Sequence, residues 1–312
     1  MENFWQKLNK KEKPILALAP MAGVTDSAFR QICKKYGADV VYSEMASVSA
    51  LVYNPEKTLK LLEFNKKERP YVVQLFGNKP EHFKKAVAIV EKEIKPDGID
   101  INLGCPVPKV LKQGAGAALM KDLQKSYEVI KVVVENTSLP VSVKTRAKSG
   151  NINVLQFIEK IKDLNVSAIM IHGRTLRQGF VGNIDYEILK KAKKQFKGAV
   201  LGSGGLNSYQ DVKKMLEKTS IDGVGIARGA MGRPYIFKEI KKKKDKNLSK
   251  RKIFKLIKKH AKLVFKLKGE HGIIELRKHL CWYVQGLDGA SKYRSEFIKV
   301  SSLKDIDNIL KK

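Results

Sequence analysis

The segment Asp100-Ile-Asn-Leu-Gly-Cys-Pro106 carries the clearest chemical signal in the sequence. Residues 98–102 form a short apolar run that predicts a β-strand, and this run ends in an asparagine followed by a tight turn with a cysteine. Parallel α/β proteins concentrate their chemistry at such strand ends, because the loops that follow the strands share one edge of the sheet. A cysteine in this turn is a thiol acid, a thiolate nucleophile or a small packing residue. The role of Cys105 therefore decides what the protein does.

Other side chains that suit a binding site stand at the ends of similar apolar runs. Gln74 offers an amide that both donates and accepts, Lys144 offers a positive charge and His172 offers an imidazole. Glycine-rich turns, Ser203-Gly-Gly205 and Ala227-Arg-Gly229, follow the last two runs and present backbone N–H groups, which predicts a phosphate site. Such a phosphate would belong to a cofactor whose ring system lies beside Gln74, Lys144 and His172.

Each of these residues also has a purely structural interpretation. Gly204 and Gly205 are common in ordinary turns, Lys144 would suit an ion pair at a rim, and His172 would suit a core position. Cys105 would suit a small buried apolar site. The functional interpretation is favoured because polar or glycine-rich segments follow all eight of the apolar runs in the sequence.

These eight runs recur with the rhythm of strand–helix repeats. They predict strands at 15–19, 40–43, 71–75, 98–102, 141–145, 168–172, 199–203 and 223–227. Segments between them predict helices at 27–36, 81–93, 126–135, 154–164 and 208–217. Eight such units predict a parallel (β/α)₈ TIM barrel, with an open doubly wound sheet as the alternative. In a barrel, the residues named above would meet at the mouth formed by the C-terminal ends of the strands.

Composition limits the class of protein and points to its partner. The chain has 312 residues, and its 62 Lys and Arg against 31 Asp and Glu give a net charge of +31. So large an excess indicates a polyanionic partner, although a lysine-rich proteome would produce part of it. The three cysteines are too far apart for a zinc site or a disulfide scaffold, and we assign Cys33 and Cys281 to packing. We expect no bound metal, no signal peptide and no membrane span, and therefore a cytoplasmic protein.

The positive charge is concentrated toward the C-terminal end of the chain. Residues 238–312 hold 23 Lys and Arg against 8 Asp and Glu, a net of +15. A helix is predicted at 253–267, because apolar residues recur there at helical spacing and the opposite face is nearly all lysine. Further helices at 274–285 and 291–300 would complete a small bundle. We therefore predict two domains, a TIM barrel over residues 1–240 and a small basic α-helical bundle over residues 241–312.

A set of short motifs runs through nearly the whole chain. They are Pro20-Met-Ala-Gly-Val-Thr-Asp26, Ser43-Glu-Met45, Gln74-Leu-Phe-Gly77, Asp100 to Pro106, Gly114-Ala-Gly116, Val143-Lys-Thr-Arg146, His172-Gly-Arg-Thr175, Ala227 to Pro234 and Arg277 to Tyr283. In content and order they resemble the motifs of the tRNA-dihydrouridine synthases, flavin enzymes that reduce uridine in RNA. The chain departs from the family pattern at Ser203-Gly-Gly205, where the family usually has Asn-Gly-Asp, and at Phe180, where it usually has tyrosine.

The resemblance implies that FMN binds in the barrel mouth and that Cys105 is the general acid. It implies flavin contacts from residues after strands throughout the barrel: Pro20, Met21, Ala22, Gln74, Lys144, His172, Ser203, Gly204, Gly205, Ala227 and Arg228. Asn102 and Arg174 would face the uracil. Arg277 and Lys278 in the basic region would bind the RNA.

The resemblance also implies the reaction, which reduces the C5–C6 bond of specific uridines in tRNA to 5,6-dihydrouridine after NADPH has reduced the flavin. The uridine must leave its base stack to enter the barrel, so the basic domain would serve to hold the tRNA. We expect a monomer. The alternatives are ribosomal RNA as substrate, a flavin barrel acting on free pyrimidines, and an RNA-binding barrel without catalysis. A free pyrimidine would leave the basic domain without a role, and the intact Cys105, Lys144 and His172 argue for catalysis.

Overall fold

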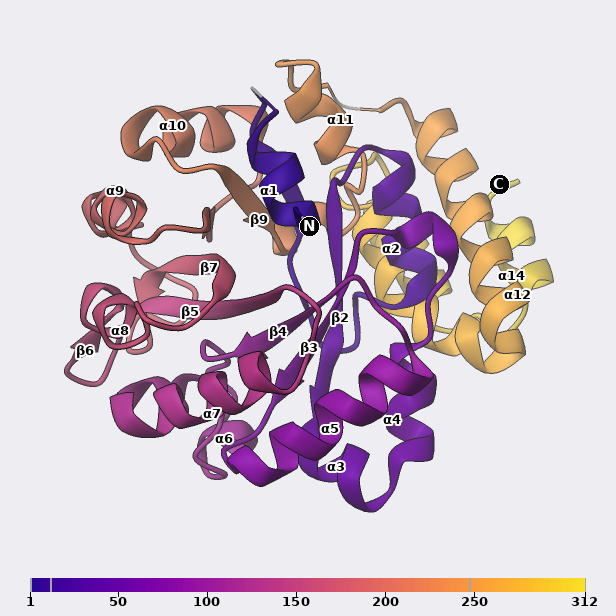
Figure 1. The fold of residues 1–312 in the computed structure, drawn as a ribbon. Helices are drawn as coiled ribbons and strands as arrows, with labels where there is room; N and C mark the ends of the chain where they lie inside the picture. The colour runs from indigo at the N-terminus through magenta and orange to yellow at the C-terminus, as the bar shows by residue number, and fades with distance from the viewer. Residues whose placement is uncertain (1, 12, 247, 312) are drawn as a thin grey trace.

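The computed structural model describes residues 2–11, 13–246 and 248–311, and its central element is a closed parallel β-barrel (Figure 1). Within these residues the barrel is formed by β1 (Ile15–Leu18), β2 (Val40–Ser47), β3 (Tyr71–Phe76), β4 (Gly98–Asn102), β5 (Val141–Ser149), β7 (Val166–Thr175), β8 (Ala199–Ser203) and β9 (Gly223–Ile226). Their order is β4-β3-β2-β1-β9-β8-β7-β5, and pairing of β4 with β5 closes the ring. A two-residue strand, β6 (Ile152–Asn153), pairs antiparallel with the end of β5. The predicted TIM barrel is confirmed.

The strands match the predicted ones closely, and apart from β7, which begins two residues early, the differences lie at their C-terminal ends. β4 has the predicted bounds, whereas β2, β5 and β7 continue for several residues beyond the apolar runs. Many of the extra residues are polar, and they still pair across the sheet, as Arg146 does with His172 and Lys148 with Thr175. The register shifts between Tyr42 and Met45 and between Arg146 and Lys148, so the barrel rim contains irregular strand pairing at these points.

Helices cover the outside of the barrel (Figure 1). They are α2 (Ser27–Lys35), α3 (Val48–Tyr53), α4 (Pro55–Leu62), α5 (Pro80–Glu93), α6 (Pro108–Leu111), α7 (Leu123–Glu135), α8 (Val154–Lys160), α9 (Tyr186–Gln195), α10 (Tyr209–Thr219) and α11 (Ile236–Lys241). Short 3₁₀ turns lie at Lys66–Glu68, Gly116–Lys121 and Arg228–Ala230. The five predicted barrel helices appear as α2, α5, α7, α8 and α10, and α8 ends earlier than the spacing predicts. In α5 the buried face contains Phe83, Val87 and Val90, as helical periodicity requires.

A short N-terminal helix, α1 (Phe4–Asn9), covers the end of the barrel where the strands begin (Figure 1). Its Trp5 is fully buried and packs with Ala17, Tyr42 and Met170 from three different strands. An asparagine caps this helix, since the side chain of Asn3 accepts a hydrogen bond from the backbone of Gln6. A large aromatic side chain thus fills the lower part of the barrel.

The C-terminal region is helical, as predicted, and consists of α12 (Lys250–Tyr283), α13 (Ala290–Phe297) and α14 (Leu303–Ile309). The two helices predicted at 253–267 and 274–285 are the two halves of α12, which bends at Gly269 where φ is 62°. Glycine is suited to this bend because other residues rarely adopt a positive φ. The region has its own apolar core, which includes Leu276, Leu280 and Phe297 and extends to Ile32 on α2.

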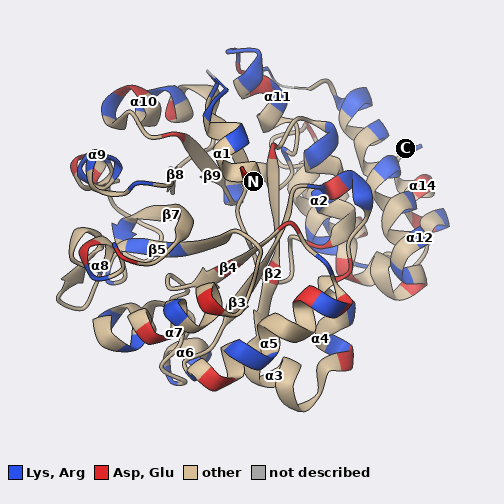
Figure 2. Cartoon of the chain, in the orientation of Figure 1, with Lys and Arg blue, Asp and Glu red and all other residues tan. Residues whose placement is uncertain are grey.

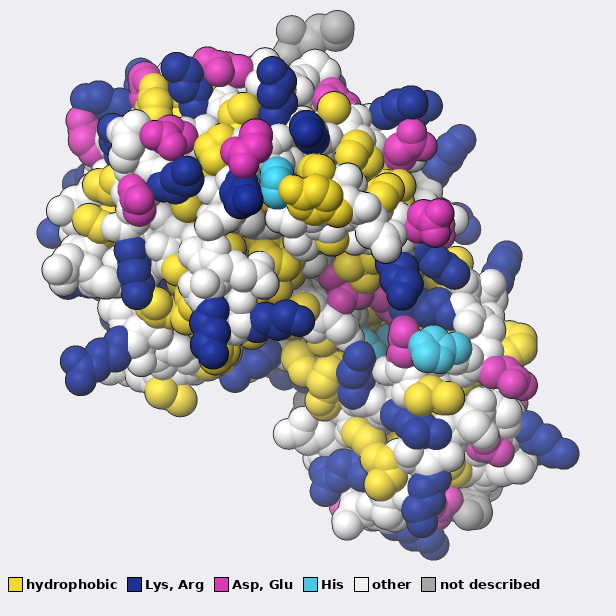
Figure 3. Space-filling model, turned by 90° about the horizontal axis from the view of Figure 1, so that it is seen from below, with side chains coloured by type: hydrophobic (Ala, Val, Ile, Leu, Met, Phe, Trp, Pro, Cys, Tyr) yellow, Lys and Arg dark blue, Asp and Glu magenta, His cyan; other side chains and the backbone are white. Residues whose placement is uncertain are grey.

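The helical region forms a lobe beside the barrel, and a hollow separates the two lobes on the face shown in Figure 3. Lysine and arginine residues recur along α12 and in the segment that follows α11 (Figure 2). None of the helices in the described ranges is both long enough and apolar enough to span a bilayer. The same residues contain no cluster of three His, Cys, Asp or Glu side chains placed to hold a metal ion.

Candidate active site

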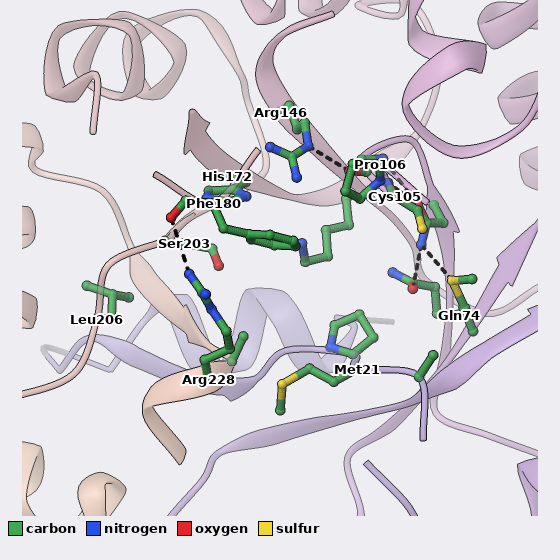
Figure 4. A pocket seen from close by; sticks show the side chains of 18 of the residues that line it. Met21, Gln74, Cys105, Pro106, Arg146, His172, Phe180, Ser203, Leu206 and Arg228 are labelled. Atoms are coloured by element: carbon green, nitrogen blue, oxygen red, sulfur yellow. Dashed lines mark hydrogen bonds between the residues drawn. The ribbon is translucent and has the colours of Figure 1, made fainter. Parts of the chain in front are cut away.

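A cavity of about 350 Å³ opens at the C-terminal ends of the strands. Volumes of this size are typical of small-molecule sites. Its walls include every cofactor residue expected from the sequence, together with Asn102 and Cys105: Pro20, Met21, Ala22, Gln74, Lys144, His172, Ser203, Gly204, Gly205, Ala227 and Arg228. Cys105 and Gln74 lie on one wall, and Ser203 and Arg228 lie on the opposite wall (Figure 4).

The turn that carries Cys105 is fixed by its backbone. The N–H groups of Gly104 and Cys105 both donate to Oδ1 of Asn102, at 3.1 and 2.9 Å. The carbonyl of Cys105 accepts from the N–H of Ala117 at 3.0 Å. Gly116 has φ of 60°, and a Cβ there would lie 2.9 Å from the Cys105 carbonyl oxygen, so a larger residue would push this turn away. Cys105 is thus held at the cavity wall as a partly exposed free thiol.

Three buried polar side chains orient one another beneath this turn. The carboxylate of Asp100 accepts from Gln74 Nε2 at 2.7 Å and from the hydroxyl of Ser142 at 2.7 Å. Gln74 Oε1 in turn accepts from Asn102 Nδ2 at 2.9 Å. Because a carboxylate only accepts, it fixes which end of the Gln74 amide faces it, and Gln74 then fixes the amide of Asn102. The oxygen of Asn102 is thereby turned toward the Cys105 backbone.

Burial affects the charge of Asp100 at the start of this chain of hydrogen bonds. Burial raises the pKa of Asp100 to about 6, although the hydrogen bonds from Gln74 and Ser142 oppose the shift. The group is therefore mostly ionised at neutral pH and acts as the pure acceptor that the arrangement requires. Protonation below pH 6 would give it a donor and weaken the orientation of Gln74.

The cavity is strongly electropositive. Burial lowers the pKa of Lys144 to about 8, and no hydrogen-bond partner for its ammonium is found in the described residues. Burial and four neighbouring cations, Lys144, Arg146, Arg174 and Arg228, lower the pKa of His172 to about 2. His172 is thus neutral at ordinary pH and offers one donor and one acceptor. Such a donor set suits a ligand that carries negative charge.

The loops after β8 and β9 form a narrow cradle on one side of the cavity. Gly204 has φ of 105°, and a Cβ there would lie 2.5 Å from the ring of His172. Gly205 also has a positive φ, of 68°. Backbone N–H groups in such turns, together with the guanidinium of Arg228, are suited to a phosphate. The residues present therefore fit a flat cofactor with an anionic tail, which is the chemistry of FMN.

Arg146 has a structural role at the site that the sequence analysis did not assign. Its guanidinium is almost fully buried and donates to the carbonyls of Gly104, Thr175 and Gly179 at 2.8, 3.1 and 2.8 Å. It therefore ties the Cys105 turn to the loop after β7. The sequence places Arg146 at the end of a predicted strand, which indicates a position at the barrel mouth. It does not indicate the three carbonyl partners, because these lie in distant parts of the chain.

Phe180, from the same loop, lies across the cavity (Figure 4). Its ring stacks on His172 with the centroids 6.1 Å apart, and the guanidiniums of Arg228 and Arg146 lie 4.7 and 5.6 Å from its centroid. Cation–π contacts of this kind contribute about 0.5–1 kcal/mol each when exposed. Further lining residues to which the sequence analysis assigned no role are Met45, Pro106, Val107, Leu206 and Asn207.

Comparison with known families agrees with this geometry. Residues 17–312 match the model of the family described as dihydrouridine synthase (Dus). The chain belongs to this family. It is therefore an enzyme, and the oxidoreductase class expected from the sequence is confirmed.

Similar dihydrouridine synthases occur in several bacteria. The chain is 34% identical over 303 residues to a probable tRNA-dihydrouridine synthase of Aquifex aeolicus, with 96% of this chain and 95% of that protein covered. It is 36% identical over 289 residues to a probable tRNA-dihydrouridine synthase of Helicobacter pylori strain 26695, covering 91% and 87%. It is 33% identical over 300 residues to tRNA-dihydrouridine synthase B of Pseudomonas aeruginosa, covering 94% and 89%.

More distant solved structures share the barrel fold. Histamine dehydrogenase from Rhizobium sp. 4-9 superimposes with a TM-score of 0.59 at 11% identity, covering 80% of this chain and 49% of that one. A 2-naphthoyl-CoA reductase superimposes with a TM-score of 0.57 at 13% identity, covering 77% and 53%. The dihydrouridine synthase chain thus spans about half the length of these two structures.

The residues expected to contact substrate lie in three different settings. Arg174 is beside the cavity, where its Nε donates to the carbonyl of Gly182 at 2.8 Å. Arg277 lies within the helical lobe and donates to the carbonyl of Val300 at 2.8 Å, so it holds α12 to the segment between α13 and α14. Lys278 is exposed in a cleft of about 240 Å³ between the lobes, with Nζ 3.5 Å from where a Cβ on Gly23 would lie. Lys278 therefore faces the barrel mouth and Arg277 does not.

Proposed function

We propose that this dihydrouridine synthase reduces the C5–C6 bond of specific uridines in tRNA, with FMN bound in the active-site cavity and NADPH as the reductant. The observation that carries the proposal is the Cys105 thiol, which is held at one wall of an electropositive cavity. The opposite wall is formed by the glycine-rich turns and Arg228, which are suited to bind a phosphate. The bacterial relatives, which are named tRNA-dihydrouridine synthases, support tRNA as the substrate.

Residues on both walls are suited to hold the cofactor. The N–H groups of Gly204 and Gly205 and the guanidinium of Arg228 would bind its phosphate. Lys144 and His172 would face its ring system, where a positive charge stabilises the reduced ring. When bound, FMN would supply the hydride that reaches C6 of the uracil. The cradle needs no side chain at Gly205, so the departure from the family's Asn-Gly-Asp loop leaves the backbone donors in place.

Cys105 would deliver the proton that C5 needs to complete the reduction. The hydrogen bonds from its backbone to Asn102 would keep the thiol aimed into the cavity while the uracil enters. Asn102 and Arg174 would border the uracil, with the amide of Asn102 already committed to the Cys105 turn.

The basic C-terminal segment would hold the RNA while the barrel carries out the reaction. We assign residues 1–240 to catalysis and residues 241–312 to tRNA binding, since the second segment is strongly basic and borders the cleft beside the mouth. Lys278 would contact a phosphate near the flipped uridine, and Arg277 would position the helix that carries it. The enzyme would act as a monomer in the cytoplasm, where tRNA and reduced thiols are found.

The direct test is to incubate the purified protein with NADPH and unmodified tRNA, and to measure dihydrouridine by mass spectrometry. The proposal predicts protein-bound FMN and a gain of two hydrogen masses at particular uridines. Parallel reactions with ribosomal RNA, uracil and dihydroorotate separate the alternatives. Colourless protein that takes up no FMN, or activity confined to free pyrimidines, would overturn the proposal.

A further inference from the structure

A second large hollow lies far from the active-site cavity and shares no lining residue with it. It is a groove of about 780 Å³ between α2, α11 and the first half of α12. We call it the basic groove, because eight exposed lysines line it: Lys35, Lys238, Lys242, Lys244, Lys246, Lys252, Lys255 and Lys259. Its floor is partly apolar and contains Tyr36, Tyr235 and Leu256.

The groove lies toward the end of the barrel opposite to the mouth. Helix α2 begins just after the C-terminal end of β1 and runs back along the barrel, so Lys35 at its last turn is near the start of the strands. At the same end Lys241 forms an ion pair with Asp39, the residue before β2, at 2.7 Å. Both lobes contribute to the groove, since α2 and α11 belong to the barrel side and α12 belongs to the helical lobe (Figure 1).

The eight lysines of the groove lack carboxylate partners of their own among the described residues. In the part of the chain that the structure describes, none of the eight lysines forms an ion pair with a carboxylate. Glu239 is the one acidic lining residue, and its oxygens accept from Arg233 Nη2 and from the backbone N–H of Lys246. Eight like charges around one hollow repel each other unless an anion lies between them.

Two of these lysines, Lys35 on α2 and Lys259 on α12, line the groove from opposite lobes. The positive charge of Lys35 acts on Lys259 across the groove. Partial burial, together with this neighbouring ammonium, lowers the pKa of Lys259 to about 8. An anion placed between the two side chains would convert this repulsion into attraction.

A line of lysines connects the groove with the barrel mouth. Lys252, Lys255, Lys259, Lys262 and Lys266 are spaced by three and four residues, which places them on one face of α12. The helix continues toward the mouth, where Lys268, on the opposite face of α12 from this stripe, pairs with Asp26 in the cleft at 2.9 Å. From Lys250 to Lys268 a helix rises roughly 27 Å. An RNA that follows this stripe would therefore reach both sites.

We propose that the basic groove binds the phosphodiester backbone of the RNA substrate at a second place, remote from the reacting uridine, and that the lysine stripe on α12 leads the RNA from the mouth to the groove. The proposal rests on RNA being the substrate and goes further by assigning a defined site on the far side of the barrel. Backbone contacts of this kind supply affinity and orientation without reading the sequence. A short RNA held at the mouth would not reach the groove.

The test removes one lysine from each wall of the groove in the triple variant Lys35→Gln, Lys242→Gln and Lys259→Gln. The control, Lys190→Gln, Lys191→Gln and Lys194→Gln, removes the same charge from exposed lysines on α9. Binding is measured without FMN or NADPH, so the result does not depend on whether uridine is reduced. The ligands are a full-length tRNA transcript and a hairpin containing a single arm of it.

For full-length tRNA, the groove variant should bind roughly tenfold more weakly, with a salt dependence shallower by about two phosphate contacts. The control variant should bind within twofold of the wild type, and the hairpin should bind the groove variant and the wild type equally. Equal weakening by the control variant, or equal weakening for the hairpin, would overturn the proposal. So would unchanged tRNA binding together with loss of binding to anionic phosphatidylglycerol vesicles, which would assign the groove to a lipid surface.

Discussion

The active-site cavity and the basic groove are both rich in positive charge, but their charges are held in different ways. In the cavity, Arg146 donates to three carbonyls and His172 stacks against Phe180, so these two side chains have fixed positions. In the groove, eight exposed lysines have no carboxylate partner in the described residues. Fixed groups suit one rigid ligand of defined shape, whereas free lysines suit a long flexible polyanion whose phosphates vary in position.

The largest effect should come from the thiol in the cavity. We expect Cys105→Ala to lower kcat for dihydrouridine formation by roughly 10³- to 10⁴-fold, because a positioned acid contributes up to about that much. FMN content and the Kd for tRNA should stay within twofold of the wild type. The matched control is Cys281→Ala, which removes a thiol from the helical lobe and should leave kcat within twofold. Near-normal turnover by Cys105→Ala would remove this thiol from the mechanism.

Salt should separate the two regions nearly as strongly. Raising the salt concentration from 50 to 200 mM should weaken tRNA binding by about 10³-fold if six phosphates are contacted. FMN binding should change only a few-fold, because its partners are fewer and partly buried. Titrations of both ligands at four salt concentrations give the two slopes. Equal slopes of log Kd against log salt concentration for FMN and tRNA would mean that the two sites do not differ in how they hold their charges.

Asp100→Asn should have a smaller effect that is confined to the cavity. An amide has one acceptor oxygen, so if that oxygen keeps the Ser142 bond, the amide NH2 faces Gln74 Nε2 and forces Gln74 to turn over, and the oxygen of Asn102 would leave the Cys105 backbone. We expect kcat to fall about 10- to 100-fold while the Kd for FMN changes less than about fivefold. The rate of alkylation of Cys105 by iodoacetamide should change as well.

Ser142→Ala is the control for Asp100→Asn. It removes the other hydrogen bond to the same carboxylate but leaves the Gln74 contact in place. Its kcat should stay within about threefold of the wild type. If the two variants lose activity equally, Asp100 serves only as a buried structural group and the orientation of Gln74 does not depend on it.

The smallest predicted effect is the pH dependence of FMN binding. Lys144 is protonated below its pKa of about 8 and loses its charge as the pH rises through that value. Attraction to an anionic cofactor is therefore present at pH 7 and lost above pH 8, so the Kd for FMN should rise several-fold by pH 9.5. Fluorescence titration at each pH measures this change. Lys144→Arg should flatten the profile, since arginine keeps its charge; a flat profile in the wild type would exclude the role given to Lys144.

Much of the barrel and its cavity could be predicted because both depend on local signals. Apolar runs predict all eight barrel strands, and the rule that chemistry follows strand ends places Gln74, Cys105 and Lys144 at one mouth, where the structure has them. The structure adds the hydrogen bonds that link Asp100 to Gln74 and Gln74 to Asn102, which the sequence does not indicate.

The features that escaped prediction depend on contacts between distant segments. Arg146 donates to carbonyls of two separate loops, and no local sequence pattern predicts those partners. Arg277 stood in a motif expected to bind RNA, but its guanidinium holds the carbonyl of Val300 within the helical lobe. The basic groove needs Lys35 from α2 and Lys259 from α12, which are brought together by docking of the two lobes.

The most direct test of the central claim is a crystal structure of the protein with FMN. The account predicts the phosphate against the backbone of Gly204 and Gly205 and the guanidinium of Arg228, with Lys144 beside the ring and the sulfur of Cys105 facing its open side. FMN bound outside this cradle, or a Cys105 turn that points its sulfur away from the ring, would contradict it.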